Sequence, residues 1–95
     1  MPPNTQASNI YVITLHDDAD YNAHIRGLKR VISVENARVA NGDSESTWIS
    51  HVDSDIFVEA GLPMYSGTFG KPVLRWIRAR QDVKRVEVDA NSAYA

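Results

Sequence analysis

The residues best suited to acid–base or metal chemistry in this chain are its three histidines, His16, His24 and His51. They do not form the HExxH spacing with which two histidines on one helix face bind zinc. His16 and His51 fall near the ends of predicted strands, and His24 falls on the surface of a predicted helix. The positions of the histidines therefore predict neither a metal centre nor a catalytic site.

One segment, 16–20 (His-Asp-Asp-Ala-Asp), is rich in oxygen ligands and could in principle bind a hard cation. The EF-hand pattern is absent, however, and aspartates that directly precede a helix usually cap its free N–H groups. We therefore predict a helix start at this segment, and no metal.

Serine chemistry is equally unsupported. Ser66 in Tyr65-Ser66-Gly67 lacks the first glycine of the GxSxG turn that exposes a nucleophilic serine. A P-loop, a GxGxxG loop and a motif of paired carboxylates are also absent from the sequence. The sequence predicts a protein that is not an enzyme and that needs no cofactor.

Length and composition predict a single soluble domain. The 95 residues suffice for one hydrophobic core, and 43% apolar with 23% charged residues is ordinary for a globular protein. The chain has no cysteine, which excludes disulfides and favours a reducing compartment. The polar N-terminus lacks a signal-peptide pattern, and no apolar run approaches the roughly 20 residues that span a bilayer. We expect a cytoplasmic protein that does not enter membranes.

The charge distribution argues against nucleic acid as a partner. The net charge is −2, although six of the ten basic residues lie between Lys71 and Arg85. That cluster is typical of a solvated helix face, and a phosphate- or membrane-binding patch is the alternative. Tyr65 and Phe69 share a predicted strand but lack the basic, glycine-flanked pattern of RNA-recognition modules.

The first half of the chain predicts a leader, a strand and a helix. Residues 1–8 carry two prolines and small polar residues, and we expect a disordered leader. Residues 10–15 form a β-branched run that is apolar on both pleat faces, as in a central strand. Apolar positions from Tyr21 to Ile32 are spaced four, three and four apart, which predicts an α-helix of about three turns. Gly27 within this helix suggests close packing against a strand.

The second half predicts three strands and one helix. After a turn at Asn41-Gly42-Asp43, residues 47–52 read as a strand, and 56–58 either continue it after a bulge or form one helical turn. Residues 64–69 form the next strand, in which Gly67 permits a close approach. Pro72 starts a second helix, and 83–88 form the last strand. The resulting order βαββαβ predicts an α+β, ferredoxin-like fold: a four-stranded antiparallel sheet with two helices on one face.

Three of these segments, taken in order, resemble the inhibitor I9 family, which comprises subtilisin propeptides and related free-standing fungal inhibitors. Residues 10–19 (IYVITLHDDA) resemble its opening pattern YIVTLKDD, residues 65–69 (YSGTF) its GFSGxL strand, and 83–89 (VKRVEVD) its closing VxxIExD strand. The stretch 35–63 is longer than its counterpart in the family, and Val88 stands where an acidic residue is common.

The resemblance implies an inhibitor of subtilisin-like serine proteases, monomeric when free, with residues 9–89 as the I9-like domain. Family members lay the helix-free face of the sheet on the protease and run their C-terminal tail into the active-site cleft like a substrate. The protease-binding residues implied in this chain lie in the tail and near the closing strand: Ala90, Asn91, Ser92, Ala93, Tyr94, Ala95, Tyr65, Glu87 and Asp89.

Several points stay open at this stage. Either Ala95 would fill the primary specificity pocket of the protease or, if the tail is shifted by one residue in the cleft, Tyr94 would fill it. The initiator Met1 favours a free-standing inhibitor over a propeptide that acts as a folding chaperone for a following protease. A different class of function is an interaction module that contacts a non-protease partner through the sheet or through the basic second helix, with Arg75, Arg78 and Arg80.

Overall fold

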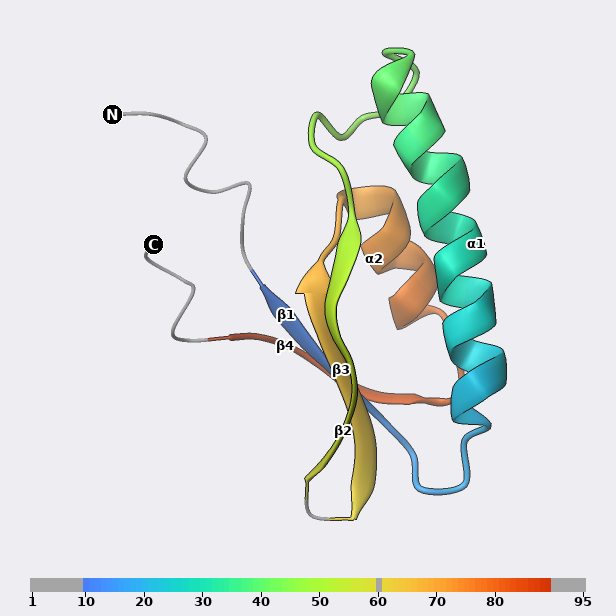
Figure 1. Cartoon of the computed structure of the whole chain (residues 1–95), viewed down its shortest axis with the longest axis vertical. Helices are drawn as coiled ribbons and strands as arrows, with labels where there is room; N and C mark the ends of the chain where they lie inside the picture. The colour runs from blue at the N-terminus through green and yellow to red at the C-terminus, as the bar shows by residue number, and fades with distance from the viewer. Residues whose placement is uncertain (1–9, 60, 90–95) are drawn as a thin grey trace.

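The computed structural model describes residues 10–59 and 61–89, and within 54–59 it describes the backbone alone. Two helices lie on one side of a four-stranded sheet (Figure 1). The elements, in chain order, are β1 (Tyr11–Leu15), α1 (Tyr21–Ala40), β2 (His51–Glu59), β3 (Leu62–Thr68), α2 (Lys71–Arg78) and β4 (Val83–Val88).

The strand order β2-β3-β1-β4, with antiparallel neighbours throughout, confirms the predicted α+β, ferredoxin-like arrangement. β1 and β3 occupy the centre, and β2 and β4 form the two edges. The central position of β1 agrees with its apolar residues on both pleat faces, because a central strand is flanked on both sides and shielded from water.

The register of the central strands decides which side chains meet the helices. Ile13 pairs with Tyr65 on β3 and with Val86 on β4. Ile13 and Tyr65 are fully buried, and Val86 packs against the same core. Because side chains alternate along a strand, the neighbouring row points to the opposite face of the sheet. The helix-covered face is therefore the one that contains Ile13.

A bulge at Lys84 keeps two valines of β4 on the helix-covered face. Thr14 pairs with Arg85 while Leu15 pairs with Val83, so Lys84 is an extra residue in the ladder. Without the bulge, Val83 and Val86 would point to opposite faces, since they are three residues apart. Both instead pack against the core.

The core between sheet and helices is formed by large apolar side chains. Leu28 of α1 and Ile77 of α2 are fully buried, as are Ile13 and Leu15 of β1. Complete burial of each such side chain contributes about 1.5–3 kcal/mol. On α2, Val73, Leu74 and Ile77 form the buried apolar stripe, and Pro72 lies in the first turn.

α1 is longer than its apolar spacing predicts: it runs for 20 residues to Ala40 and does not end near Ile32. The last turns are held by polar contacts to the following loop, which a search for apolar periodicity misses. The Asn36 side chain donates to the Ser50 carbonyl and accepts from the Ser50 amide, both at 2.9 Å. The predicted turn at Asn41-Gly42 ends the helix, and Gly42 adopts a φ of 75°.

The start of α1 is as predicted for an aspartate cap. The Asp20 carboxylate accepts from the Ala23 amide at 3.0 Å. The glycine in the helix, by contrast, packs against the second helix and not against a strand. A Cβ at Gly27 would lie 3.1 Å from the indole ring of Trp76.

β2 starts later than predicted and continues through residues 56–58, for which the sequence left two structures open. Its first residue is His51, so Trp48 and Ile49 precede the strand. Residues 56–58 belong to the strand, which excludes the alternative of one helical turn. The register against β3 shifts between Val52 and Ser54 and again before Phe57.

Candidate interaction site on the open face of the sheet

One face of the sheet carries no helix (Figure 1), and two cross-strand rows describe its centre. The first row consists of Ser66, Val12 and Glu87, and the second of Met64, Thr14 and Arg85. These six residues alternate with the core residues of the same strands, so they point away from α1 and α2. We call this set the open face.

The open face is less apolar than the sequence of β1 suggests. Thr14 and Met64 are buried within the sheet, and Val12 is half-buried. The remaining positions are a hydroxyl and two charged groups. Large exposed apolar side chains among the described residues are Val34, Ile49 and Val88, none of which belongs to either row. The expected apolar contact surface is in fact a mixed one, with a small apolar centre and charged margins.

The two charged residues of the open face, Arg85 and Glu87, lie on the edge strand β4. On β4, Arg85 and Glu87 approach to 3.5 Å, with about half of each side chain exposed. Such exposed pairs contribute only about 0–1 kcal/mol to stability, so both groups can rearrange toward a partner at little cost. On the β2 side, the His51 and Asp53 side chains lie 2.7 Å apart.

The residues predicted to bind a protease, apart from Tyr65, fall into three groups. Glu87 is exposed on the open face. Asp89 follows β4, and its amide donates to the Ile10 carbonyl at 2.7 Å, which extends the β4–β1 pairing by one residue. Residues 90–95, the predicted tail, lie outside the described residues.

Tyr65, although predicted to bind a protease, does not lie on the protein surface. Its side chain is fully buried on the helix-covered face, where its hydroxyl lies 2.8 Å from Nε2 of His24. Burial away from water raises the pKa of Tyr65 well above its usual range, and the negative charge of Asp82 acts in the same direction. Tyr65 therefore remains a neutral hydroxyl that serves the core.

His24 is the residue that sequence reasoning misplaced. It is 4% exposed, and its Nδ1 lies 2.9 Å from the Asp82 carboxylate. A neutral ring that donates from Nδ1 to Asp82 leaves Nε2 to accept from the Tyr65 hydroxyl. The arrangement joins α1, β3 and the turn before β4. The signal was present: His24 lies four residues before buried Leu28, hence on the same helix face.

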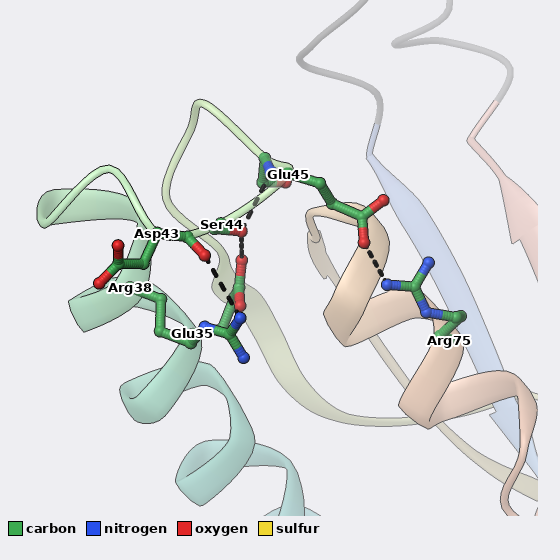
Figure 2. Close-up of polar contacts among 7 residues, drawn as sticks. Glu35, Arg38, Asp43, Ser44, Glu45 and Arg75 are labelled. Carbon is green, nitrogen blue, oxygen red and sulfur yellow. Dashed lines mark hydrogen bonds and ion pairs between the residues drawn. The ribbon is translucent and has the colours of Figure 1, made fainter.

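The basic residues in α2 and directly after it are partly engaged within the chain. Arg75 forms an ion pair with Glu45 (Figure 2), and its guanidinium holds the pKa of Glu45 below the usual value. The Arg80 guanidinium lies 5.0 Å from the centre of the Trp76 ring, a cation–π geometry. Arg78 is exposed. Two of the six basic residues in the cluster, Arg75 and Arg80, are therefore engaged by groups of this chain.

Among the side chains that the structure describes, those of residues 10–53 and 61–89, no group of three or more histidines, aspartates or glutamates could hold a metal ion. In the same part of the chain, no helix is long and apolar enough to cross a membrane.

Comparison with models of known protein families finds no match, and no curated protein matches the chain.

Proposed function

We propose that this chain inhibits subtilisin-like serine proteases as a free-standing cytoplasmic monomer. The open face docks on the protease, and the C-terminal tail enters the active-site cleft in the manner of a substrate. The observation that carries the proposal is the relation between the open face and the end of β4: the strand that contributes Arg85 and Glu87 is also the one that leads into the tail.

The geometry of β4 supports this arrangement. The strand is an edge strand, and pairing to β1 continues through the Asp89 amide. The chain is thus held extended through Asp89, the residue before the tail. An extended segment can add to a protease cleft by strand pairing. Because the end of β4 is already ordered, less conformational entropy is lost when the tail binds to the protease.

The residues then divide by role. Glu87 contributes to docking through the open face, and Asp89 fixes the exit of the chain. Tyr65 contributes indirectly, as part of the core beneath the sheet. Residues Ala90, Asn91, Ser92, Ala93, Tyr94 and Ala95 occupy the cleft.

Inhibition of subtilisin, measured with a chromogenic peptide substrate, tests the proposal. We expect inhibition in the nanomolar-to-micromolar range, weakened at least about tenfold by deletion of 90–95. Glu87→Lys should weaken inhibition as well, because it reverses a charge on the docking face. Arg78→Glu, on α2 and away from the open face, is the matched control and should inhibit like the parent chain.

The two registers of the tail give opposite results. If Tyr94 fills the primary pocket, Tyr94→Ala weakens inhibition and removal of Ala95 does not. If Ala95 fills it, removal of Ala95 causes the larger loss. A full-length chain that several subtilisin-type proteases digest without being slowed would refute the inhibitor proposal and favour an interaction module on the same fold.

A further inference from the structure

A groove runs along α1 beside the first turn of α2, in the helix layer and away from the open face. Its volume is about 300 Å³, and its exposed lining is mostly apolar. The residues that line it are Arg30, Val31, Val34, Glu35, Arg38 and Pro72. We propose that this groove binds a short acidic segment of a partner protein, with one apolar side chain between two carboxylates.

The floor of the groove is an apolar surface in contact with water. Val34 is 59% exposed, more than any other large apolar side chain in the described part of the chain. Half-buried Val31 and Pro72, which is at the start of α2, line the groove together with Val34. Covering this surface removes apolar area from water, which favours a partner that brings an apolar side chain.

The rim of the groove is positively charged. Arg30 and Arg38 are eight residues apart on α1, which separates them by about 12 Å along the helix axis and about 80° around it, with Val34 midway between them. Neither guanidinium forms an ion pair with a carboxylate within 10–53 or 61–89. Arg38 donates to the Asp43 main-chain carbonyl at 3.3 Å (Figure 2), and its side chain stays exposed.

The acidic groups nearby are already engaged. The buried Glu35 carboxylate accepts a hydrogen bond from the Ser44 hydroxyl, and Glu45 pairs with Arg75 (Figure 2). Glu45 also attracts Arg38 at longer range, but neither acid forms an ion pair with a rim arginine. The charge that complements the groove is therefore negative and must come from a binding partner.

The spacing of the rim specifies the partner further. In an extended chain, positions four apart are separated by about 13 Å. This is close to the separation of Arg30 and Arg38 along the axis of α1. The pattern acidic-x-apolar-x-acidic would place a carboxylate at each arginine and the apolar side chain over Val34. Arginine binds carboxylates through two parallel hydrogen bonds, which adds geometric selectivity. Nucleic acids and polyphosphates supply negative charge but no aliphatic side chain for the floor.

The test uses the full chain and a fluorescein-labelled 12-residue peptide with the core Glu-Ala-Leu-Ala-Glu. Fluorescence anisotropy should give a dissociation constant between about 1 μM and 1 mM. Replacing both glutamates of the peptide with glutamine should weaken binding at least about tenfold. Amide chemical-shift changes in NMR spectra should concentrate in residues 30–38 and at Lys71 and Val73, which flank Pro72.

Variants locate the contact. Arg30→Glu and Arg38→Glu should each weaken binding at least about fivefold, and Val34→Asp should do the same. Arg26→Glu is the matched control: it is exposed one turn before Arg30 but does not line the groove, so it should change binding less than about twofold. All four residues are exposed, and circular dichroism checks that each variant folds.

Four results would overturn the proposal. They are no anisotropy change up to about 1 mM protein, a loss with Arg26→Glu equal to that with Arg30→Glu, binding by Val34→Asp like the parent chain, and equal competition by polyphosphate or phosphatidylserine vesicles. The last two would mean attraction by charge alone. Protease inhibition is a separate readout, because the groove and the open face lie on opposite sides of the sheet.

Discussion

Nδ1 of His24 and the carboxylate of Asp82 lie 2.9 Å apart although the two residues are 58 positions apart in the chain. The second nitrogen of His24 meets the Tyr65 hydroxyl, so one buried ring ties the first helix to a central strand and to the turn before the last strand. A contact between such distant segments forms only when the whole fold is in place.

Removal of the His24 side chain should strongly destabilise the fold. His24→Ala leaves a cavity and a buried Tyr65 hydroxyl without its partner, which together should cost about 2–4 kcal/mol in the free energy of unfolding. Urea denaturation followed by circular dichroism measures the change. The exposed His16→Ala is the control, expected to stay within about 0.5 kcal/mol of the parent. Equal stability of the two variants would contradict the prediction.

Stability should fall at alkaline pH, in part through Tyr65. Its pKa is raised in the folded state, so the unfolded chain loses this proton first, near pH 10, and ionisation favours unfolding. The contribution is fully present below about pH 10 and is lost as the pH rises further. Urea unfolding of the parent and of Tyr65→Phe between about pH 9 and pH 11 should show a shallower decline in the variant. If the free energy of unfolding fell equally in both proteins, the loss of stability at alkaline pH would come from other groups.

Gly67→Ala should be among the most disruptive single-methyl changes in the sheet. A Cβ at this position would clash with the His51 carbonyl oxygen and lie 2.6 Å from the Phe69 ring. Relief requires movement of a strand or of a fully packed aromatic side chain, and overpacking of this kind costs about 1–3 kcal/mol or more. Thermal unfolding compares it with Ser66→Ala, the half-buried neighbour on the open face. A melting temperature for Gly67→Ala equal to that of the control would refute the clash.

Asn36→Ala should loosen the last turns of α1. It removes both hydrogen bonds to the Ser50 backbone and leaves that amide and carbonyl without these partners. We expect a loss of about 1–3 kcal/mol, with faster amide hydrogen exchange in residues 37–42 than in 22–28. Ser33→Ala, exposed on the same helix, should leave exchange unchanged. Uniform acceleration along α1 would indicate global destabilisation in place of local opening.

The parts of the fold governed by local rules were predictable from the sequence. The cap at Asp20, the turn at Gly42 and the start of α2 beside Pro72 depend on residues close in the chain. Strand β4 was predicted with its observed bounds, 83–88, although the bulge at Lys84 that orients its valines was not.

The features that were missed depend on contacts between distant segments. The length of α1 depends on Asn36 meeting Ser50, and the burial of His24 depends on Asp82 and Tyr65. The groove beside Val34 exists because Pro72 is brought against α1. Apolar periodicity carries no information about any of these pairings, since each joins a polar or exposed residue to another element.

The bulge at Lys84 also bears on how copies of this protein meet one another. An edge strand presents unpaired backbone groups to which a second chain can add and so begin aggregation. On β4 the ladder is interrupted, and the interruption carries the exposed charges of Lys84 and Arg85. The opposite edge, β2, has two register shifts of its own. We therefore expect both edges to be poor templates for sheet extension, which keeps concentrated solutions of the protein from polymerising edge to edge.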